Sequence, residues 1–430
     1  MKRYFGATFA SLWIRNYRLY FMGQAISFTG TWMQKLAQAW LVLELTDSGA
    51  WLGITAALQQ LPTLFLSAWA GVLADRYSKR AIMVWSAAAA MVPAALLGVF
   101  CLTGSDNIHI VMAIILLGGL VDAFDKPARQ AFPSEMVGPD RLANAVMLNN
   151  VVQDTGRVVG PAIGGVLIAA VGLSSTFFIN AVSFITVILG LVLMRSDELI
   201  HPPRSPRSKG DIRAGVAYVR ANPQLLGPLV LLACAGVVAL NFQVMIPLLG
   251  QQAFNGDART VGYLLSAFGL GSIAGGLSLA GVVSATVGRI IGVAIAVGVL
   301  FILTGLAPTV AVALGVVFVL GAAVMLYKAL SSTWLQLTAE PAMRGRVLAL
   351  LVVAMGGTTP IGGPLLGWLS EHFGIRATFA FAGICTALAA VALYWYVRRT
   401  VGRTREDSPH RDSPNDDDRN DDDRQHSARR

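Results

Sequence analysis

The sequence has few charged side chains. Lys, Arg, Asp and Glu make up 13% of its 430 residues, whereas hydrophobic residues make up 55% and the mean hydropathy is +0.62. A soluble domain carries about 25% charged residues. The apolar runs of this chain are long enough to cross a bilayer, which takes roughly 20 residues of helix. The composition therefore argues against an ordinary soluble domain and predicts an integral membrane protein.

Residues that perform catalysis or bind metals are also scarce. The chain has 3 cysteines and 5 histidines. Each cysteine lies in an apolar run without a CxxC pattern or a nearby His, which is typical of small buried hydrophobic residues. The histidines fall in predicted loops or in the tail, so no metal or nucleophile site can form at bilayer depth. The sequence lacks GxxxxGK[ST], which excludes ATP hydrolysis by this chain. We expect neither an enzyme nor a cofactor.

The net charge is +9, which in a soluble protein would suggest a nucleic-acid partner. Here the Lys and Arg residues gather in alternate loops, as they do in the cytoplasmic loops of membrane proteins. The predicted outer loops contain only Arg259 and Arg376. This asymmetry predicts both termini in the cytoplasm and a multi-pass protein of the cell membrane, and it removes the argument for nucleic acid.

Twelve apolar segments are predicted to cross the bilayer as helices. Their approximate ranges are 19–43, 51–74, 81–103, 108–125, 142–170, 174–194, 224–250, 260–284, 288–306, 309–330, 346–369 and 375–397. The predicted fold class is therefore all-α, with a six-helix N-terminal half (1–194) and a six-helix C-terminal half (223–400).

Two polar segments complete the predicted organisation. The loop at 195–222 joins the halves, and Ile212, Val216 and Val219 at helical spacing predict a short amphipathic helix on the inner membrane surface. The charged repeats of 401–430 cannot form a core and predict a disordered cytoplasmic tail.

An internal repeat supports the division into halves. Gly160-Pro161-Ala162-Ile163-Gly164 in the fifth predicted span corresponds to Gly363-Pro364-Leu365-Leu366-Gly367 in the eleventh, offset by 203 residues. Duplicated six-helix halves are a common plan of secondary transporters. Neither an enzyme nor a single-pass receptor would need one, so the repeat predicts a transporter.

The loop between the second and third spans reads Gly71-Val72-Leu73-Ala74-Asp75-Arg76-Tyr77-Ser78-Lys79-Arg80. It resembles the major facilitator superfamily signature G-x-L-A-D-R-x-G-[RK]-[RK], and Ser78 in place of Gly is the only departure. The resemblance implies the major facilitator fold and an inner gate that latches the halves on the cytoplasmic side in the outward-open state. Its expected residues are Gly71, Asp75, Arg76, Lys79 and Arg80, with Asp125 as a partner of Lys79 or Arg80. The alternative is a basic loop that only sets topology.

The fifth span contains Gly156-Arg157-Val158-Val159-Gly160-Pro161-Ala162-Ile163-Gly164-Gly165. It matches the superfamily pattern G-x(3)-G-P-x(2)-G-G, which is associated with proton-driven exporters and implies export. The antiporter-type residues would be Gly156, Arg157, Gly160, Pro161, Gly164 and Gly165. Glycines four residues apart form a smooth stripe that permits close helix packing, and Pro161 is expected to bend the backbone. Ordinary small-residue packing is the alternative.

Four further stretches resemble the enterobactin-exporter and macrolide-efflux branch of the superfamily. They are Asp122–Phe132, Asp140–Ala145, Gly30–Gln34 and Trp40–Thr46. The resemblance extends over residues 1–400 and implies a small-molecule substrate such as a siderophore or a macrolide, without fixing which.

Charged residues inside predicted spans cost roughly 2.5–3.5 kcal/mol each on insertion scales, so each calls for a partner or a task. Asp154 and Arg157 share a helix face and form either a proton-coupling pair or a static ion pair. Asp122 is a second proton-coupling candidate. Lys35 either faces the cavity and attracts an anionic substrate or extends its ammonium towards the surface. The candidates for contact with an apolar substrate, which packing or lipid contact would equally explain, are Trp32, Met33, Phe242 and Met245.

The predicted function is export of a small, moderately hydrophobic molecule in exchange for protons. The cavity is expected between the halves near the midplane, lined by spans 1, 4, 7 and 10, with alternating access by rocking of the halves. The expected partners are the substrate, protons and the lipid bilayer, and the sequence makes no prediction about oligomeric state. An importer or uniporter on the same fold, or a membrane sensor, are the alternatives.

Overall fold

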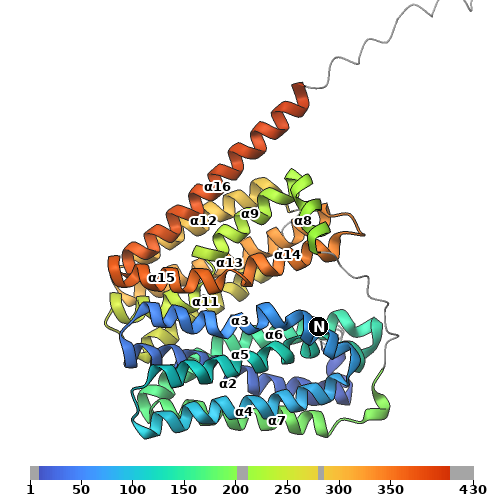
Figure 1. Cartoon of the computed structure of the whole chain (residues 1–430), viewed down its shortest axis with the longest axis vertical. Coiled ribbons are helices and arrows are strands. Elements are labelled where there is room, and N and C mark those ends of the chain that lie inside the picture. Colours follow the sequence, from blue (N-terminus) through green and yellow to red (C-terminus); the bar gives the residue numbers. More distant parts are fainter. Residues whose placement is uncertain (1–8, 201–211, 279–284, 407–430) are drawn as a thin grey trace, which may run out of the picture.

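The computed structural model describes residues 9–200, 212–278 and 285–406, and all regular elements of these residues are helical (Figure 1). The elements of the first half are η1 (Ala10–Trp13), α2 (Arg15–Thr46), α3 (Gly49–Arg76), α4 (Lys79–Thr103), α5 (Ile108–Ala131), α6 (Pro133–Val171), α7 (Leu173–Val192) and η2 (Ser196–Glu198). Those that follow are α8 (Ile212–Ala221), α9 (Pro223–Val238), α10 (Phe242–Leu248), the π-helix η3 (Leu249–Ala253), α11 (Ala258–Ser278), α12 (Val287–Leu306), α13 (Val310–Thr338), α14 (Arg344–Gly356), α15 (Thr359–Phe373) and α16 (Ile375–Glu406).

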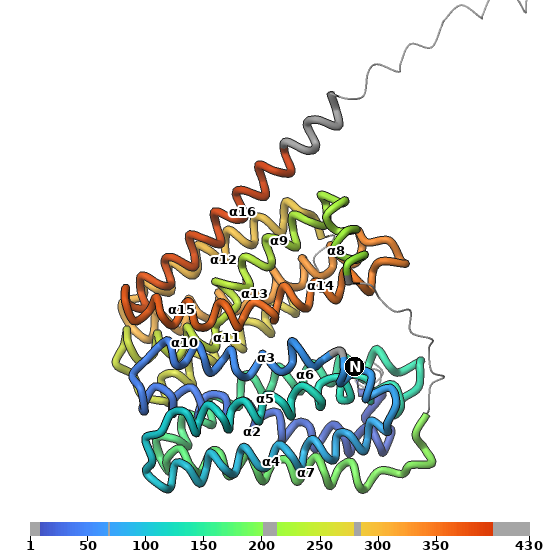
Figure 2. Tube along the Cα trace, in the orientation of Figure 1, coloured from blue at the N-terminus to red at the C-terminus, as the bar shows by residue number. Residues whose placement is uncertain are grey.

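The helices form two bundles, one above the other in Figure 1 and in the tube of Figure 2. In the N-terminal bundle, α2 packs against α6 and α7, and α4 packs against α5 and α7. In the C-terminal bundle, α11 packs against α13, and α12 packs against α16. The two bundles touch mainly where α3 meets α15 and α6 meets α11.

Ten helices of the described residues are long and apolar enough to cross a membrane, or eleven with the bent pair Gly49–Ser67 and Trp69–Arg76. Two of the ten are composite, Pro223–Ala253 and Arg344–Phe373. The polar helix α2 is not among them, although it packs at the centre of the N-terminal bundle. The all-helical membrane architecture is thus confirmed, whereas the count of twelve spans stays a prediction.

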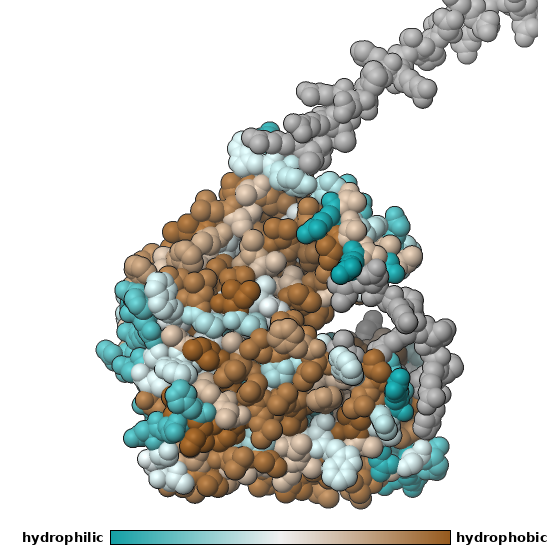
Figure 3. All heavy atoms as spheres, in the orientation of Figure 1, coloured by the Kyte–Doolittle hydropathy of each residue, from teal (hydrophilic) through white to brown (hydrophobic). Residues whose placement is uncertain are grey.

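The outer faces of the bundles are strongly apolar, as the brown surface in Figure 3 shows. Large side chains such as Trp85, Val182 and Leu388 are 60–75% exposed. A soluble monomer rarely exposes a contiguous apolar surface of this extent. Lipid chains are the medium that covers such a surface at low cost.

Some helix boundaries differ from those predicted. α6 begins at Pro133, well before the predicted start at 142, and contains one non-helical residue, Gly138, with φ +68°. This left-handed conformation suits glycine, which lacks the Cβ that would clash. α16 continues to Glu406, beyond the predicted start of the tail at 401, while residues 407–430 of that tail lie outside the described residues.

The predicted amphipathic helix corresponds to α8, on which Arg213 and Arg220 are exposed and Val219 is buried. The preceding part of the polar loop, residues 201–211, lies outside the described residues.

The two ends of the molecule differ in how closely the bundles approach. We call the end that holds the Arg76–Arg80 loop the basic end and the other the opposite end. At the opposite end two seams join the bundles: Gly49 and Gly53 of α3 lie against Gly367 and Gly363 of α15, and Gly262 of α11 lies against α6. At the basic end Figure 3 shows a hollow between the bundles. The molecule is therefore closed at the opposite end.

Candidate substrate cavity

A cavity of about 260 Å³ lies within the N-terminal bundle, lined by α2 to α7. Its wall combines aromatic residues such as Phe28 and Phe184 with amides such as Gln34 and Asn180. Asn180 Nδ2 donates to Gln34 Oε1 at 2.7 Å. The prediction that spans 1, 4, 7 and 10 share the wall is wrong for this cavity, because the residues lining it all belong to the N-terminal bundle. Spans 1 and 4 do contribute, through α2 and α5.

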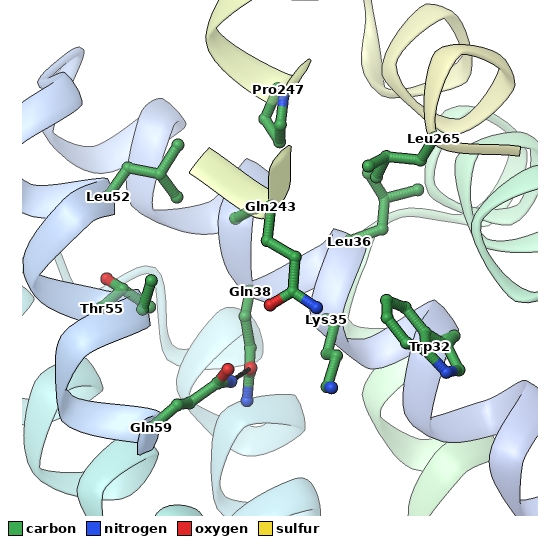
Figure 4. Close-up of a pocket in the computed structure, with 12 residues that line it drawn as sticks. Trp32, Lys35, Leu36, Gln38, Leu52, Thr55, Gln59, Gln243, Pro247 and Leu265 are labelled. Atoms are coloured by element: carbon green, nitrogen blue, oxygen red, sulfur yellow. Dashed lines mark hydrogen bonds between the residues drawn. The ribbon is translucent and has the colours of Figure 1, made fainter. Parts of the chain in front are cut away.

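A smaller cavity of about 30 Å³ lies between the bundles next to the first (Figure 4). It shares Trp32, Lys35, Gln38 and Gln59 with the larger cavity, and further residues of α2 and α3 together with residues of α10 and α11 supply its remaining wall. Gln59 Nε2 donates to Gln38 Oε1 at 2.5 Å, and Gln243 of α10 points towards this amide pair in Figure 4. These shared residues therefore face both the N-terminal cavity and the C-terminal bundle.

Two ion pairs follow one another along α5 on the cavity wall. Lys126 Nζ lies 3.9 Å from Asp122 Oδ2, and Arg129 Nη1 lies 3.3 Å from Asp125 Oδ2. In this conformation Asp125 does not pair with Lys79 or Arg80, so its expected place in the inner gate of the outward-open state stays a prediction. Because α5 continues to Ala131, Asp125 lies inside the helix facing the cavity rather than in the loop.

The pair on α6 has the predicted geometry. Arg157 Nη1 lies 3.2 Å from Asp154 Oδ1, with both side chains about one-third exposed. The Arg157 guanidinium carbon also lies 5.2 Å from the centroid of the Trp32 ring. Its Nε is buried and has no hydrogen-bond partner among the described residues. The guanidinium therefore keeps one unused donor at the cavity wall.

Lys35 faces the cavity rather than the lipid. Its Nζ lies 4.3 Å from the centroid of the Trp32 ring, and both residues line the two cavities. A cation over an indole ring gains about 0.5–2 kcal/mol. The surface-directed alternative for Lys35 is therefore not the one this conformation adopts.

The other apolar candidates do not line these cavities. Met33 is buried with its Cβ near Gly164, and Met245 is buried in the apolar core. Phe242 stacks on Phe268 with ring centroids 4.5 Å apart. Met33 follows Trp32 directly, but it points about 100° away around the helix, towards Gly164 of α6.

The glycine stripe of α6 packs directly on α2. A Cβ at Gly160 would lie 2.6 Å from Trp32 Cβ, and Cβ atoms at Gly156 and Gly164 would meet Phe28 and Met33. On another side of α6, a Cβ at Gly165 would meet Ala258 of α11, and Pro161 lies against Gly262. α6 is thus held closely between α2 and α11. Helical geometry continues through Pro161, and the break in α6 lies at Gly138 instead.

The two cations that end the inner-gate signature make their contacts inside the N-terminal bundle. Lys79 Nζ pairs with Glu135 Oε1 at 2.5 Å, with both side chains largely buried. Arg80 donates to the carbonyls of Leu191 and Val192 at the end of α7 at 2.8 and 3.1 Å. These two cations therefore do not latch the bundles together in this conformation, in agreement with the hollow at the basic end.

The remaining signature residues lie at the junction of α3 and α4. Gly71, Asp75 and Arg76 occupy the last turns of α3, and Asp75 and Arg76 are exposed. Ser78, the departure from the signature, caps α4, because its Oγ accepts from the Ala81 N–H at 3.4 Å. The serine thus supplies a capping hydrogen bond that glycine, which has no side-chain oxygen, would not make.

Glu135 was missed by sequence reasoning. The available signal was a Pro-Ser-Glu start of a helix directly after the Asp122–Phe132 stretch, since Pro at the first position and an acid in the first turn mark a helix N-terminus. The cavity amides Gln38, Gln59 and Gln153 were missed as well. Their signal was the recurrence of Gln within otherwise apolar spans.

Comparison with known proteins agrees with these features. The profile of a major facilitator superfamily family described as transmembrane secretion effector matches residues 6–422. The chain belongs to this family. It is accordingly a multi-pass transporter of the cell membrane and not an enzyme.

Relatives of named function are transporters of different small molecules. The staphyloferrin A transporter of Staphylococcus aureus is 23% identical over 91% of this chain and 99% of its own. Macrolide efflux protein A of Streptococcus pyogenes is 23% identical over 87% of this chain and 95% of its own. Multidrug efflux pump Tap of Mycolicibacterium fortuitum is 27% identical over 84% of this chain and 91% of its own.

Solved structures share the fold. A bacterial homologue of the human lysosomal transporter Spinster, in an inward-facing and unoccupied conformation, gives a TM-score of 0.71 at 14% identity, covering 90% of this chain and 98% of its own. The nucleoside transporter NupG gives 0.70 at 14% identity, covering 89% of this chain and 99% of its own. At this identity the likeness establishes the major facilitator fold alone.

Proposed function

We propose that this transporter exports a small, moderately hydrophobic molecule from the cytoplasm by proton antiport with alternating access. The proposal depends chiefly on the cavity of about 260 Å³, whose wall places carboxylate–cation pairs beside aromatic rings. Protonation of a paired carboxylate releases its cation, so such pairs can exchange a proton for a substrate. The relatives named for siderophore transport, macrolide efflux and multidrug efflux support a small-molecule substrate.

The closed seams support an inward-facing loading state. If the basic end lies in the cytoplasm, as basic loops do, the glycine seams seal the outer side and the hollow faces the cytoplasm. The inner gate of Lys79 and Arg80 would then latch only in the outward-open state. Rocking of the two bundles would connect these states.

Proton coupling is assigned to Asp154 with Arg157 and to the Asp122 and Asp125 pairs. Everted vesicles that contain the protein would be given a pH gradient, acid inside, and a panel of macrolides, dyes and siderophores. We expect uptake that a protonophore abolishes. Asp154→Asn should lower gradient-driven uptake on the order of tenfold, whereas Asp197→Asn, an exposed acid outside the cavity, should leave it unchanged.

Two other outcomes of this experiment would contradict parts of the proposal. Full gradient-driven uptake by Asp154→Asn would make its pair with Arg157 a static one. Transport in the opposite direction, or transport that ignores the pH gradient, would favour an importer or a uniporter.

A further inference from the structure

The cations of the cavity outnumber the carboxylates near them. Lys126 and Arg129 each have an acid within 4.0 Å on α5, and Arg157 has Asp154. Among the described residues no carboxylate lies within 4.0 Å of Lys35 Nζ; its nearest interactions are with the Trp32 ring and, at longer range, with Asp122, which already pairs with Lys126. The wall therefore carries a cation whose charge is only partly compensated.

A second such cation comes from the C-terminal bundle. Lys328 of α13 is half-buried and interacts electrostatically with Arg157 and Asp154, and it forms no ion pair within 4.0 Å in the part of the chain that the structure describes. Arg157 interacts with both Lys35 and Lys328. Lys35, Arg157 and Lys328, called the arc below, are thus electrostatically coupled cations from both bundles, and Asp154 is the one carboxylate within 4.0 Å of any of them among the described residues.

The arc is prepared to receive an anion. Arg157 Nε is buried without a hydrogen-bond partner among the described residues, and Lys35 Nζ and the Arg157 guanidinium carbon lie 4.3 and 5.2 Å from the centroid of the same Trp32 ring. A charge held at bilayer depth without a counter-ion is costly. A guanidinium with a free N–H binds a carboxylate in a directed way that a lone ammonium does not. A ligand carboxylate would compensate the charge of Lys35 and accept a hydrogen bond from the free N–H of Arg157.

The surroundings of the arc define the rest of the ligand. Phe28, Ile115 and Phe184 offer apolar contact, and Gln38 and Gln59 offer amide hydrogen bonds. We propose that the cavity selects amphiphilic organic anions, in which a carboxylate binds Lys35 and Arg157 and an apolar ring system packs on Trp32 and Phe28. The inference deepens the proposed export function and depends on it for its physiological meaning, but binding can be tested without transport.

The test uses two dyes of similar ring size and opposite charge, fluorescein and rhodamine 123. Binding to the full-length protein in nanodiscs is measured by fluorescence anisotropy. We expect fluorescein to bind more tightly than rhodamine 123. Lys35→Gln should weaken fluorescein binding about tenfold and leave rhodamine binding unchanged or stronger. Lys35→Arg should restore it, and Arg220→Gln, which removes an exposed cation outside the cavity, should have no effect.

Fluorescein binding that is absent, weaker than rhodamine binding, or insensitive to Lys35→Gln in a variant of unchanged thermal stability would overturn the inference. A second measurement, of the uptake of each dye by everted vesicles, tests the export proposal separately from the binding result. Selective anion binding without uptake would contradict export and preserve the inference. Uptake of rhodamine 123 without fluorescein binding would support export and contradict the inference that the cavity selects organic anions.

Discussion

The ion pair between Lys79 and Glu135 illustrates how single side chains stabilise this fold. It joins the start of α4 to the start of α6 across 56 residues of sequence, at 2.5 Å and with side chains only 16% and 10% exposed. The pair of Arg195 with Glu198, by contrast, is local and exposed. Exposed pairs contribute little to stability, whereas a charged hydrogen bond shielded from water contributes more.

Replacing Glu135 by Gln should therefore destabilise the protein by about 1–3 kcal/mol. The expected result is a lower unfolding temperature of the detergent-solubilised protein, followed by differential scanning fluorimetry. Glu198→Gln is the matched control and should leave the unfolding temperature nearly unchanged. Equal unfolding temperatures for the two variants would show that the Lys79–Glu135 pair contributes no more than a surface pair.

Residues could be assigned from the sequence where the motif is local, and not where the partner is distant. The Asp154–Arg157 pair follows from helical spacing, and the structure has it at 3.2 Å. The partners of Asp125 and Lys79 could not be predicted, because they depend on how far α5 extends and where α6 begins. Trp32 and Met33 are neighbours of similar chemistry, so only the rotation of α2 decides which one faces the cavity.

At the scale of elements, one of the closest backbone approaches is between helices that belong to different bundles. A Cβ placed on Gly53 of α3 would lie 2.2 Å from the carbonyl oxygen of Gly363 on α15. At the end of the same seam, Glu371 of α15 accepts hydrogen bonds from the Ser48 hydroxyl and from the Ala50 N–H at 3.1 Å, and so caps α3. The repeat identified in the sequence thus supplies one side of a seam between the bundles.

Gly53→Ala should consequently open the seam and shift the population away from this conformation. The measurement is disulfide cross-linking of a Ser48→Cys, Glu371→Cys pair in a background without the native cysteines, where the cross-linked fraction should fall. Gly292→Ala is the control, because a Cβ added at this helical glycine would meet no atom within 4 Å. An unchanged cross-linked fraction in Gly53→Ala would show that the seam tolerates a methyl group.

Helix existence was largely readable from apolar runs, but helix ends were not. Pro133 and Gly138 both mark the start of α6, one as a first helical residue and the other as a left-handed residue within it. Each residue by itself is a signal for a helix boundary, so the sequence does not say at which of the two the helix begins. Residues 19–43 of α2 were predicted as an apolar span, although the helix as a whole is not among those apolar enough to be candidate membrane spans.

At the scale of the whole molecule, the two ends should lie on opposite sides of the membrane. Tyr77 is exposed at the basic end, and Asp106 is exposed between α4 and α5 at the opposite end. In intact cells that express single-cysteine variants, a membrane-impermeant maleimide should label Asp106→Cys and leave Tyr77→Cys unlabelled until the cells are opened. The reverse pattern would place the basic end outside and contradict the predicted orientation.

The repeat and the loop at 195–222 predict a division into two halves, whose bounds stay a prediction, while the location of the larger cavity was not predicted. The sequence pattern favoured a cavity shared equally by the halves. The larger cavity instead lies within the N-terminal bundle, because the polar residues of α2, α3 and α5 face one another there. Composition alone cannot reveal such an asymmetry, since it depends on the rotation of each helix.

The glycine seams have a consequence for the rate of opening. Where backbones touch directly, no side chains interlock, so separating α3 from α15 requires few rotamer changes and releases little trapped volume. Such a contact lacks interdigitated side chains, so the two helices can separate without repacking their neighbours. Glu371, which accepts hydrogen bonds from the Ser48 hydroxyl and the Ala50 N–H at the edge of this seam, is then the polar contact that separating the two helices would have to break.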